Sequence, residues 1–357
     1  MSILTKIKSE IANSAEKAIS YERFMEISLY DEEGYYGTNR KKTGKAGDFY
    51  TSPGVHEVFS RVMGRALATA IETDVLHPSI VEIGAGEGEF LLSCLDEIQS
   101  FDKELYKRLT YYVVETSPYH RKIIENKTKN LDKVMVYSSI EELKSELKSF
   151  EGIIFSNELL DAFPVRVVEK KNGMLYEVLI GLSEIDGKLI EVYKPCTDSA
   201  ILIWIENYGF LMNEGQRIEV PLYMMSWFIS IANWMKKGRI YTIDYGYTDD
   251  EWNHPARSSG SLRGYYKHQL VQNPLENIGE MDLTTHIPLD ALRRIGEEHH
   301  FRCLECEVQG RFLVNHGLLD FVEDNRENDP FSPVHKKNRA VNWLSQMNQF
   351  QVVVQQK

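Results

Sequence analysis

A glycine-rich turn between a buried strand and a helix constrains this chain more than any other feature. Residues 80–92 read IVEIGAGEGEFLL, a β-branched run that ends in an acidic residue, passes three glycines and opens into an apolar helical pattern. Glycines let a ligand come close to the backbone, and a helix N-terminus offers N–H groups without intrahelical partners. The pattern therefore predicts a parallel strand, a tight turn and a helix start that together face a ligand.

The spacing of the glycines and one nearby carboxylate indicate which ligand this is. Gly84, Gly86 and Gly88 form G-x-G-x-G, whereas a dinucleotide pyrophosphate is typically held by G-x-G-x-x-G. Glu82 precedes the first glycine by two residues; it would repel a phosphate but attract the amino group of S-adenosylmethionine (SAM). We interpret the turn as the SAM loop of a Rossmann-like methyltransferase. A glycine-rich turn in another kind of α/β protein is the alternative.

Composition and charge narrow the possible partners. The 357 residues carry a net charge of −12, which argues against nucleic acid as a partner. Four cysteines do not make a disulfide framework, and we expect no metal site because Cys303-x-x-Cys306 has no second pair. No apolar run reaches membrane-spanning length and residues 1–8 lack a signal-peptide pattern, so we expect a cytoplasmic protein without membrane insertion.

Strand and helix patterns alternate through the first half of the chain. Short β-branched runs predict strands near 79–83, 111–115, 134–137 and 152–156, with helical patterns between them. Such strands form an open parallel sheet whose ligands bind outside the carboxyl ends of the strands. We predict an α/β fold: a Rossmann-like class I methyltransferase sheet with N-terminal helices and an inserted antiparallel β/helical substrate subdomain.

The hydrophobic period changes after residue 165, where alternating runs flank the hairpin turn Lys171-Asn172-Gly173. Near the C-terminus we expect a helix at 288–299, a strand pair within 301–314 and a last strand at 350–354. We therefore divide the chain into four regions: an N-terminal helical cap (1–75), a SAM-binding Rossmann-like core (76–165), an inserted β-hairpin and helical subdomain (166–238) and a completion of the core sheet (239–357) with a long active-site loop (249–285).

Polar residues stand at the carboxyl ends of the predicted strands. Glu82, Glu115, Asn157 with Glu158, and Asp244 each follow or close such a run. Because parallel strands end at one edge of a sheet, we expect these side chains to share one rim. Glu115 would accept charge-assisted hydrogen bonds from both ribose hydroxyls of SAM. A single acid of this kind is usually a helix cap, but a coordinated set indicates a binding site.

A series of motifs in fixed order gives the chain a specific resemblance. The motifs are GDFYTSP (47–53), the glycine turn, VE-x-SP (114–118), NELLDAFP (157–164), DYG (244–246), RGYY-x-H (263–268) and DLTTHI (282–287). With these motifs, the chain resembles from about residue 20 onward the MidA family of SAM-dependent methyltransferases, which includes the mitochondrial complex I assembly factor 7, a protein-arginine methyltransferase. It departs from that family at Ala85, Gly264 and Asn348, and matches it least over 170–215.

The resemblance implies methyl transfer to an arginine of a protein, and the chemistry of that reaction suggests roles for individual residues. A guanidinium is a poor nucleophile because its charge is delocalised and its pKa exceeds about 12, so a carboxylate has to hold and orient it. Glu158 is our first candidate, with Asp161 one helical turn later on the same face. N-terminal helix capping is the alternative for both acids. Asp244 and His286 are further catalytic candidates, although a structural, hydrogen-bonding histidine explains His286 at least as well.

Other residues are candidates for binding SAM, and other acceptors stay open. The segment containing Thr51 and Ser52 would close over SAM or substrate by resemblance, although helix capping explains both residues equally well, and Asn157 could contact SAM. The acceptor could instead be another protein nitrogen or a small molecule. The chain could also be a non-catalytic SAM-binding assembly factor for a respiratory complex, and a respiratory dehydrogenase subunit is the partner that the resemblance suggests. A dehydrogenase is the least favoured alternative, and no pattern indicates the oligomeric state.

Overall fold

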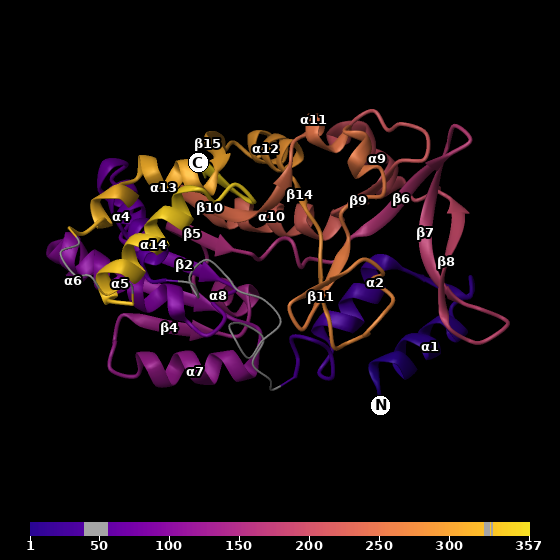
Figure 1. Ribbon diagram of the computed structural model, residues 1–357, viewed down its shortest axis with the longest axis horizontal. Helices are drawn as coiled ribbons and strands as arrows, with labels where there is room; N and C mark the ends of the chain where they lie inside the picture. The colour runs from indigo at the N-terminus through magenta and orange to yellow at the C-terminus, as the bar shows by residue number, and fades with distance from the viewer. Residues whose placement is uncertain (39–55, 325–328, 330) are drawn as a thin grey trace.

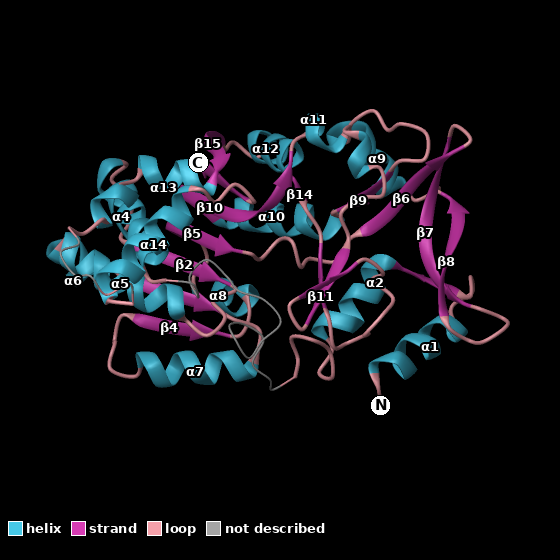
Figure 2. Ribbon diagram, viewed as in Figure 1, coloured by secondary structure: helices cyan, strands magenta, loops and turns pink. Residues whose placement is uncertain are grey.

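A computed structural model describes residues 1–38, 56–324, 329 and 331–357, and a large mixed β-sheet lies at its centre (Figures 1 and 2). The strand next to one edge, β16, runs antiparallel to both of its neighbours, while the strands from β10 to β4 are parallel. The order is β15 (Arg302–Val308), β16 (Phe350–Gln356), β10 (Met235–Tyr247), β5 (Phe150–Asn157), β2 (Ser79–Ile83), β3 (Thr110–Val114) and β4 (Val134–Tyr137), and the short β14 (Ile287–Pro288) pairs with the end of β10.

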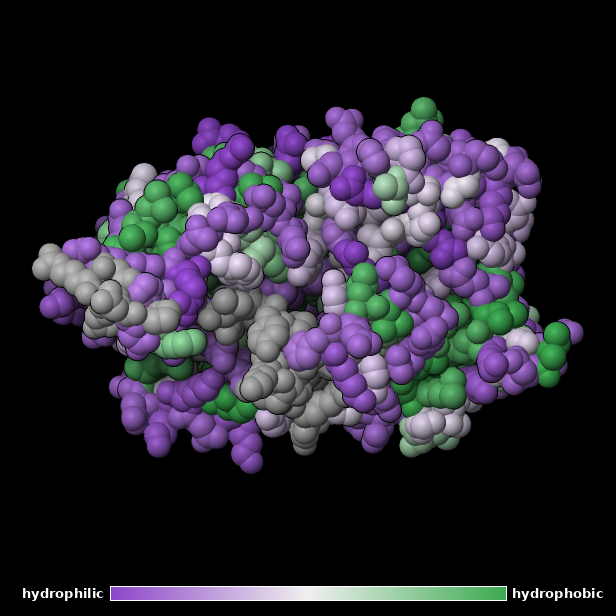
Figure 3. All heavy atoms as spheres, viewed as in Figure 1, coloured by the Kyte–Doolittle hydropathy of each residue, from purple (hydrophilic) through white to green (hydrophobic). Residues whose placement is uncertain are grey.

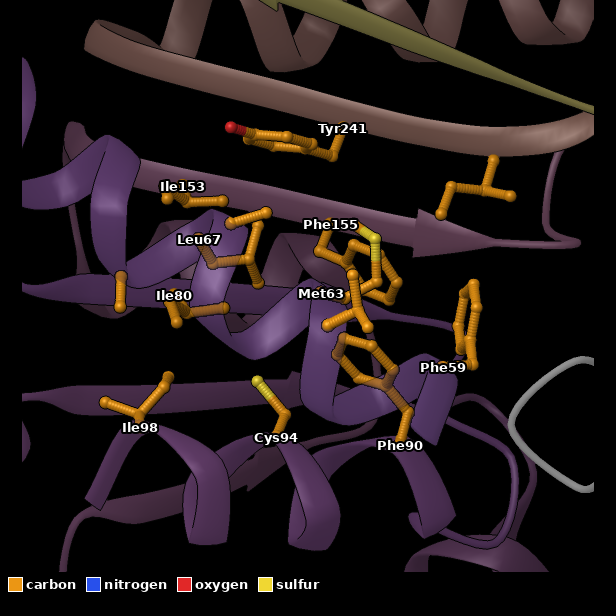
Figure 4. Close-up of a cluster of buried hydrophobic side chains, with 14 of the residues drawn as sticks. Phe59, Met63, Leu67, Ile80, Phe90, Cys94, Ile98, Ile153, Phe155 and Tyr241 are labelled. Carbon is orange, nitrogen blue, oxygen red and sulfur yellow. The ribbon is translucent and has the colours of Figure 1, made fainter. Parts of the chain in front are cut away.

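One face of this sheet is covered by helices that bury a large hydrophobic cluster. Figure 4 shows side chains of α4 and α5 packed against residues of β2, β5 and β10. Phe90, in the first turn of α5, stacks on Phe155 of β5 with ring centroids 4.1 Å apart, which fixes the glycine turn beside the end of β5. The helices on this face are α4 (Val58–Thr73), α5 (Glu89–Phe101), α13 (Gln309–Asn315), the 3₁₀ turn η3 (Leu318–Phe321) and α14 (Pro333–Ser345).

The opposite face carries a second hydrophobic cluster. Each of its helices buries one stripe of side chains against the sheet. They are α8 (Ile140–Glu146), α9 (Ser199–Tyr208), α10 (Leu222–Trp234) and α12 (Leu289–Glu298). Two further helices contribute to the first cluster: α6 (Lys103–Arg108) in the crossover between β2 and β3, and α7 (Pro118–Thr128) after β3. Within the described residues, no helix is both long enough and apolar enough to cross a membrane.

After β5 the chain leaves the large sheet and builds a second, antiparallel sheet on the right of Figure 1. The predicted hairpin is confirmed, since Asn172 and Gly173 both have positive φ between β6 and β7. The N-terminal helices pack on this sheet and share its hydrophobic core. The elements are β1 (Ala18–Ser20), β7 (Met174–Leu182), β6 (Arg166–Lys171), β9 (Arg217–Val220) and β8 (Leu189–Pro195), with α1 (Ile3–Asn13), α2 (Tyr21–Met25) and the π-helical turn η1 (Glu26–Tyr30).

The structure corrects two expectations about local structure. The segment 249–285 is not a loop: it holds α11 (Asp249–Trp252), the 3₁₀ turn η2 (Pro255–Arg257) and a three-stranded sheet of β12 (Gln269–Val271), β11 (Arg263–Tyr266) and β13 (Asp282–Thr284). Residues 301–314 form one strand, β15, followed by the helix α13, rather than a strand pair. The four strands predicted in the first half of the chain are parallel, as expected, whereas β16 runs antiparallel to its neighbours.

Candidate active site

The glycine turn leaves open space above its middle residue. Gly84, Gly86 and Gly88 have φ values of 78°, 56° and 74°, a backbone region that favours glycine. A Cβ added to the first would lie 3.0 Å from Leu159, and one added to the third 3.1 Å from Ile124. A Cβ at Gly86 would meet nothing within 4 Å. The outer glycines therefore permit close packing, whereas Gly86 borders space that a ligand can fill.

Glu115 ties this turn to the segment that follows β3. One carboxylate oxygen accepts the N–H of Gly86 at 2.8 Å, and the other accepts the N–H of Ser117 at 2.8 Å. Each oxygen keeps a further lone pair, so the hydroxyls of a ribose can still bond to it. The hydroxyl of Ser117 is buried and has no hydrogen-bond partner. A polar ligand placed here would give that hydroxyl a partner.

Glu82 lies at the end of β2, beneath the glycine turn, and is almost fully buried. The hydroxyl of Tyr111, on the neighbouring strand β3, donates a hydrogen bond of 2.8 Å to its carboxylate. Burial, together with the nearby charge of Glu115, raises the pKa of Glu82 to about 8, against the lowering effect of the Tyr111 bond. A cationic ligand beside this carboxyl would stabilise its ionised form.

A cavity of about 620 Å³ lies at the ends of β2, β3 and β4. Its walls come from both halves of the molecule: residues 116–118 and 139–141 follow β3 and β4, while aromatic rings come from η1, the segment after it and α10. This aromatic wall could not be predicted from the sequence, because its members come from distant segments and only Phe163 belongs to a motif, NELLDAFP. The aromatic lining residues are Tyr30, Tyr36, Phe163, Tyr223 and Trp227.

The conformation of Glu158 is the most unusual feature at the end of β5. Its φ of 53° lies in the left-handed region, which costs a non-glycine residue about 1 kcal/mol or more. The N–H of Glu158 donates to the carbonyl of Ile243 on β10 at 2.8 Å, and the amide of Asn157 donates to the Glu158 carboxylate at 3.0 Å. The other amide atom of Asn157, Oδ1, is buried without a partner.

The segment after Glu158 is not helical, which corrects the predicted helical spacing to Asp161. Residues 158–165 form a turn that leads directly into β6, so neither acid caps a helix and the capping alternative is wrong. Asp244 holds this turn: one carboxylate oxygen accepts the N–H groups of Leu160 and Asp161 at 2.8 and 3.2 Å, and the other accepts that of Tyr245 at 2.9 Å. The structure thus brings the three predicted acids together.

The two aspartates of this group are buried and have raised pKa values. Burial raises the pKa of Asp161 to about 7, although backbone N–H groups and the charge of Arg263 oppose the shift. Burial and the negative charges of Asp161 and Glu158 hold the pKa of Asp244 well above its usual range. Within the described residues, neither aspartate forms an ion pair. The arrangement is therefore suited to a cationic group that enters beside it.

His286 lies next to these acids, against an arginine rather than a carboxylate. Its ring stacks on Tyr247 with centroids 4.2 Å apart, and Nη2 of Arg263 donates to a ring nitrogen at 2.9 Å. Burial and the charges of Arg263 and Arg257 lower the pKa of His286 to about 3, so the ring is neutral near pH 7. Its predicted catalytic role stays a prediction. Thr51 and Ser52 lie outside the described residues.

Comparison with known proteins identifies the chemistry of this site. Residues 63–306 match the model of a family described as "Putative S-adenosyl-L-methionine-dependent methyltransferase". The chain belongs to this family. The cofactor of this methyltransferase is SAM.

A solved structure supports both the fold and the cofactor of the methyltransferase. It is a "likely methyl transferase" from Burkholderia thailandensis bound to S-adenosyl-homocysteine, which is 25% identical to this chain, has a TM-score of 0.86, and is aligned over 99% of this chain and 92% of its own. The predicted class I methyltransferase fold is thus confirmed. The described residues also fit SAM, since the space above Gly86, the lone pairs of Glu115 and the unpartnered Ser117 hydroxyl lie along one rim.

Two curated relatives match most of this methyltransferase at low identity. The Protein arginine methyltransferase NDUFAF7 homolog, mitochondrial, of Drosophila melanogaster is 24% identical over 87% of this chain and 74% of its own length. The Protein arginine methyltransferase NDUFAF7, mitochondrial, of Danio rerio is 26% identical over 89% of this chain and 77% of its own.

Proposed function

We propose that this methyltransferase transfers a methyl group from SAM to the side chain of an arginine in a protein. The observation that carries the proposal is the group of Glu158, Asp161 and Asp244, which places three carboxyls at the ends of β5 and β10. Asp161 and Asp244 are buried and, in the part of the chain that the structure describes, form no ion pair, so an incoming cation would stabilise their ionised forms. A guanidinium supplies that charge together with several N–H donors. The names of the curated relatives agree with this acceptor.

We assign the cofactor to one side of the rim and the acceptor to the other. Gly86, Glu115 and Ser117 would hold the nucleoside part of SAM, and Glu82 would face its amino group. SAM supplies a methyl group on a positively charged sulfur. The lone pair of the acceptor nitrogen would attack the methyl carbon in line with the carbon–sulfur bond, and the sulfur would leave. Asn157 stands between the two sides, because its amide donates to Glu158 while its unpartnered Oδ1 is available to a ligand.

The acidic residues would act on the guanidinium in different ways. Glu158 would accept two N–H bonds from the guanidinium, which fixes its orientation and concentrates positive charge near the carboxylate. The nitrogen far from the carboxylate would then be the nucleophile that attacks the methyl group. Asp244 is a positioning residue, since its oxygens hold the backbone of the turn. One proton is released for each methyl transferred. Asp161, with a pKa of about 7, is suited to accept it near neutral pH.

The test is the methylation of arginine in living cells. Host cells that lack this chain would be complemented with the wild type, Glu158→Gln or Glu151→Gln, fed methionine with an isotopically heavy methyl group, and analysed by mass spectrometry of their proteins. Glu151 is the matched control because it is an exposed acid at the other end of β5. We expect heavy methylarginine in the wild type and in Glu151→Gln, and none in Glu158→Gln.

Two results would redirect the proposal. Heavy methyl groups on lysine, or on a small molecule alone, would contradict arginine as the acceptor. Association with a protein partner that persists in Glu158→Gln, without any methyl transfer by the wild type, would favour a non-catalytic SAM-binding assembly factor. A respiratory dehydrogenase subunit is the first candidate partner to examine. The cytoplasmic location expected from the sequence stays a prediction for this chain.

A further inference from the structure

A second cavity, of about 540 Å³, has a wall of arginine side chains. It shares no lining residue with the cavity at the strand ends. Its walls come from α2, β6, β9 and β10 and from residues 256–274, which run from η2 past the end of β12. Arg217, Arg257 and Arg263 line it together with the carboxyl of Glu219. Figure 3 shows a mainly hydrophilic surface with hydrophobic residues in separate groups, and the chain has a net charge of −12, so three arginines in one cavity need an explanation.

The acidic groups near this cavity already have partners. Arg217 forms ion pairs with Glu169 at 3.0 Å and with Glu191 at 2.7 Å. The buried carboxylate of Glu219 accepts the N–H groups of residues 261 and 262 at 3.0 and 3.1 Å. These bonds hold the start of β11 against β9. They leave the other two arginines of the cavity without a carboxylate.

The remaining arginines are held by neutral groups. Arg257 stacks over the ring of Tyr247 at 4.1 Å and donates to the carbonyl of Glu251 at 2.8 Å. Arg263 donates from Nη2 to His286, whereas its Nε is buried and has no partner. Within the parts of the chain that the structure describes, neither guanidinium has an ion pair with a carboxylate. A buried donor without an acceptor is unfavourable, so a ligand that supplies an oxygen would be bound.

We propose that this cavity binds a carboxylate between Arg257 and Arg263. A guanidinium offers parallel N–H donors that match the two oxygens of a carboxylate. Because the carboxyl of Glu219 also lines the cavity, a monoanion suits this site better than a phosphate dianion. The cavity is larger than a carboxylate alone, so an acidic side chain of a polypeptide or a small free acid fits it. The proposal does not depend on which group is methylated.

Calorimetric titration of the full chain, without SAM, tests this site. The probes are acetyl-Gly-Glu-Gly-amide, its glutamine counterpart acetyl-Gly-Gln-Gly-amide, and sodium acetate. We expect the glutamate peptide to bind, the glutamine peptide not to bind, and the affinity to fall at least tenfold in Arg257→Gln and in Arg263→Gln. Arg302→Gln is the matched control because it removes an exposed arginine on β15, outside the cavity, and it should change nothing.

The outcomes distinguish a free acid from an acidic side chain of a polypeptide, and they also show whether the site exists. Binding of acetate as tight as that of the peptide would indicate a free acid, and binding of the peptide alone would indicate an acidic side chain. The absence of binding by both, or equal binding in the wild type and both cavity variants, would overturn the site. If Arg263→Gln does not fold, Arg257→Gln, which is partly exposed, still decides the question. SAM binding, measured in parallel, keeps this result separate from the methyltransferase assignment.

Discussion

Replacing Gly86 by alanine separates the role of the glycine turn in binding from its role in folding. The residue has a φ of 56°, so a side chain at this position costs about 1–2 kcal/mol of stability whatever the space around it. The new methyl group meets no protein atom within 4 Å, so no steric penalty is added in the absence of a ligand. The methyl group would, however, occupy the space that we assign to SAM.

The expected loss of affinity follows from this crowding. Forcing a methyl group into a filled site costs about 1–3 kcal/mol, which corresponds to a roughly 5- to 150-fold weaker Kd for SAM. Gly173→Ala is the matched control: its φ is 73°, an added Cβ also meets nothing within 4 Å, and it lies in the β6–β7 hairpin, outside the rim that we assign to SAM. Urea unfolding should show similar losses of stability in both variants.

Calorimetric titration with SAM should show the difference. Gly86→Ala should bind SAM at least fivefold more weakly than the wild type, while Gly173→Ala should bind it with unchanged affinity. Equal affinities in the two variants, at equal losses of stability, would refute the reasoning, because they would mean that the space above Gly86 is not occupied by the cofactor.

Three further changes test other parts of the site. Glu82→Gln should remove a pH dependence: the folded pKa of about 8 lies above the ordinary glutamate value of 4.5, so wild-type stability is full below pH 4.5 and is lost as the pH rises toward 8. Urea unfolding near pH 5 and pH 8 should show the variant gaining up to about 4 kcal/mol relative to the wild type. Asp244→Ala leaves three N–H groups without their acceptor and should cost about 2–4 kcal/mol, seen as a lower Tm; an unchanged Tm would contradict its positioning role. Glu158→Gly should stabilise the fold by about 1 kcal/mol because φ is 53°, yet abolish methyl transfer; a variant that kept full activity would exclude Glu158 as the residue that holds the acceptor.

Local patterns were sufficient to predict the parallel half of the sheet. The sequence predicts a strand at 79–83, and β2 lies at Ser79–Ile83, because a buried β-branched run that ends at glycines leaves few alternatives. The approach of Glu115 to the glycine turn also follows from topology, since adjacent parallel strands end at one edge. The hydrogen bond from the N–H of Gly86 to the carboxylate of Glu115 shows that the two residues are in contact.

The failures occurred where long-range contacts determine the local structure. The turn after Glu158 has a helix-like sequence, but Asp244, more than 80 residues away, binds its N–H groups and holds it in another conformation. The strands within 249–285 have three or four residues each, and they are stable only because β11 pairs with β12 and β13. The reversed direction of β16 likewise leaves no trace in its hydrophobic pattern, because either direction buries the same residues.

The rim of the sheet, with Glu115 at its centre, is most directly tested by calorimetric titration with SAM, S-adenosylhomocysteine and NAD. The account predicts that the wild type and the exposed-acid control Glu151→Ala bind SAM and S-adenosylhomocysteine but not NAD, and that Glu115→Ala loses at least tenfold in affinity for both. Undiminished binding of SAM by a folded Glu115→Ala protein would place the cofactor elsewhere and contradict the account.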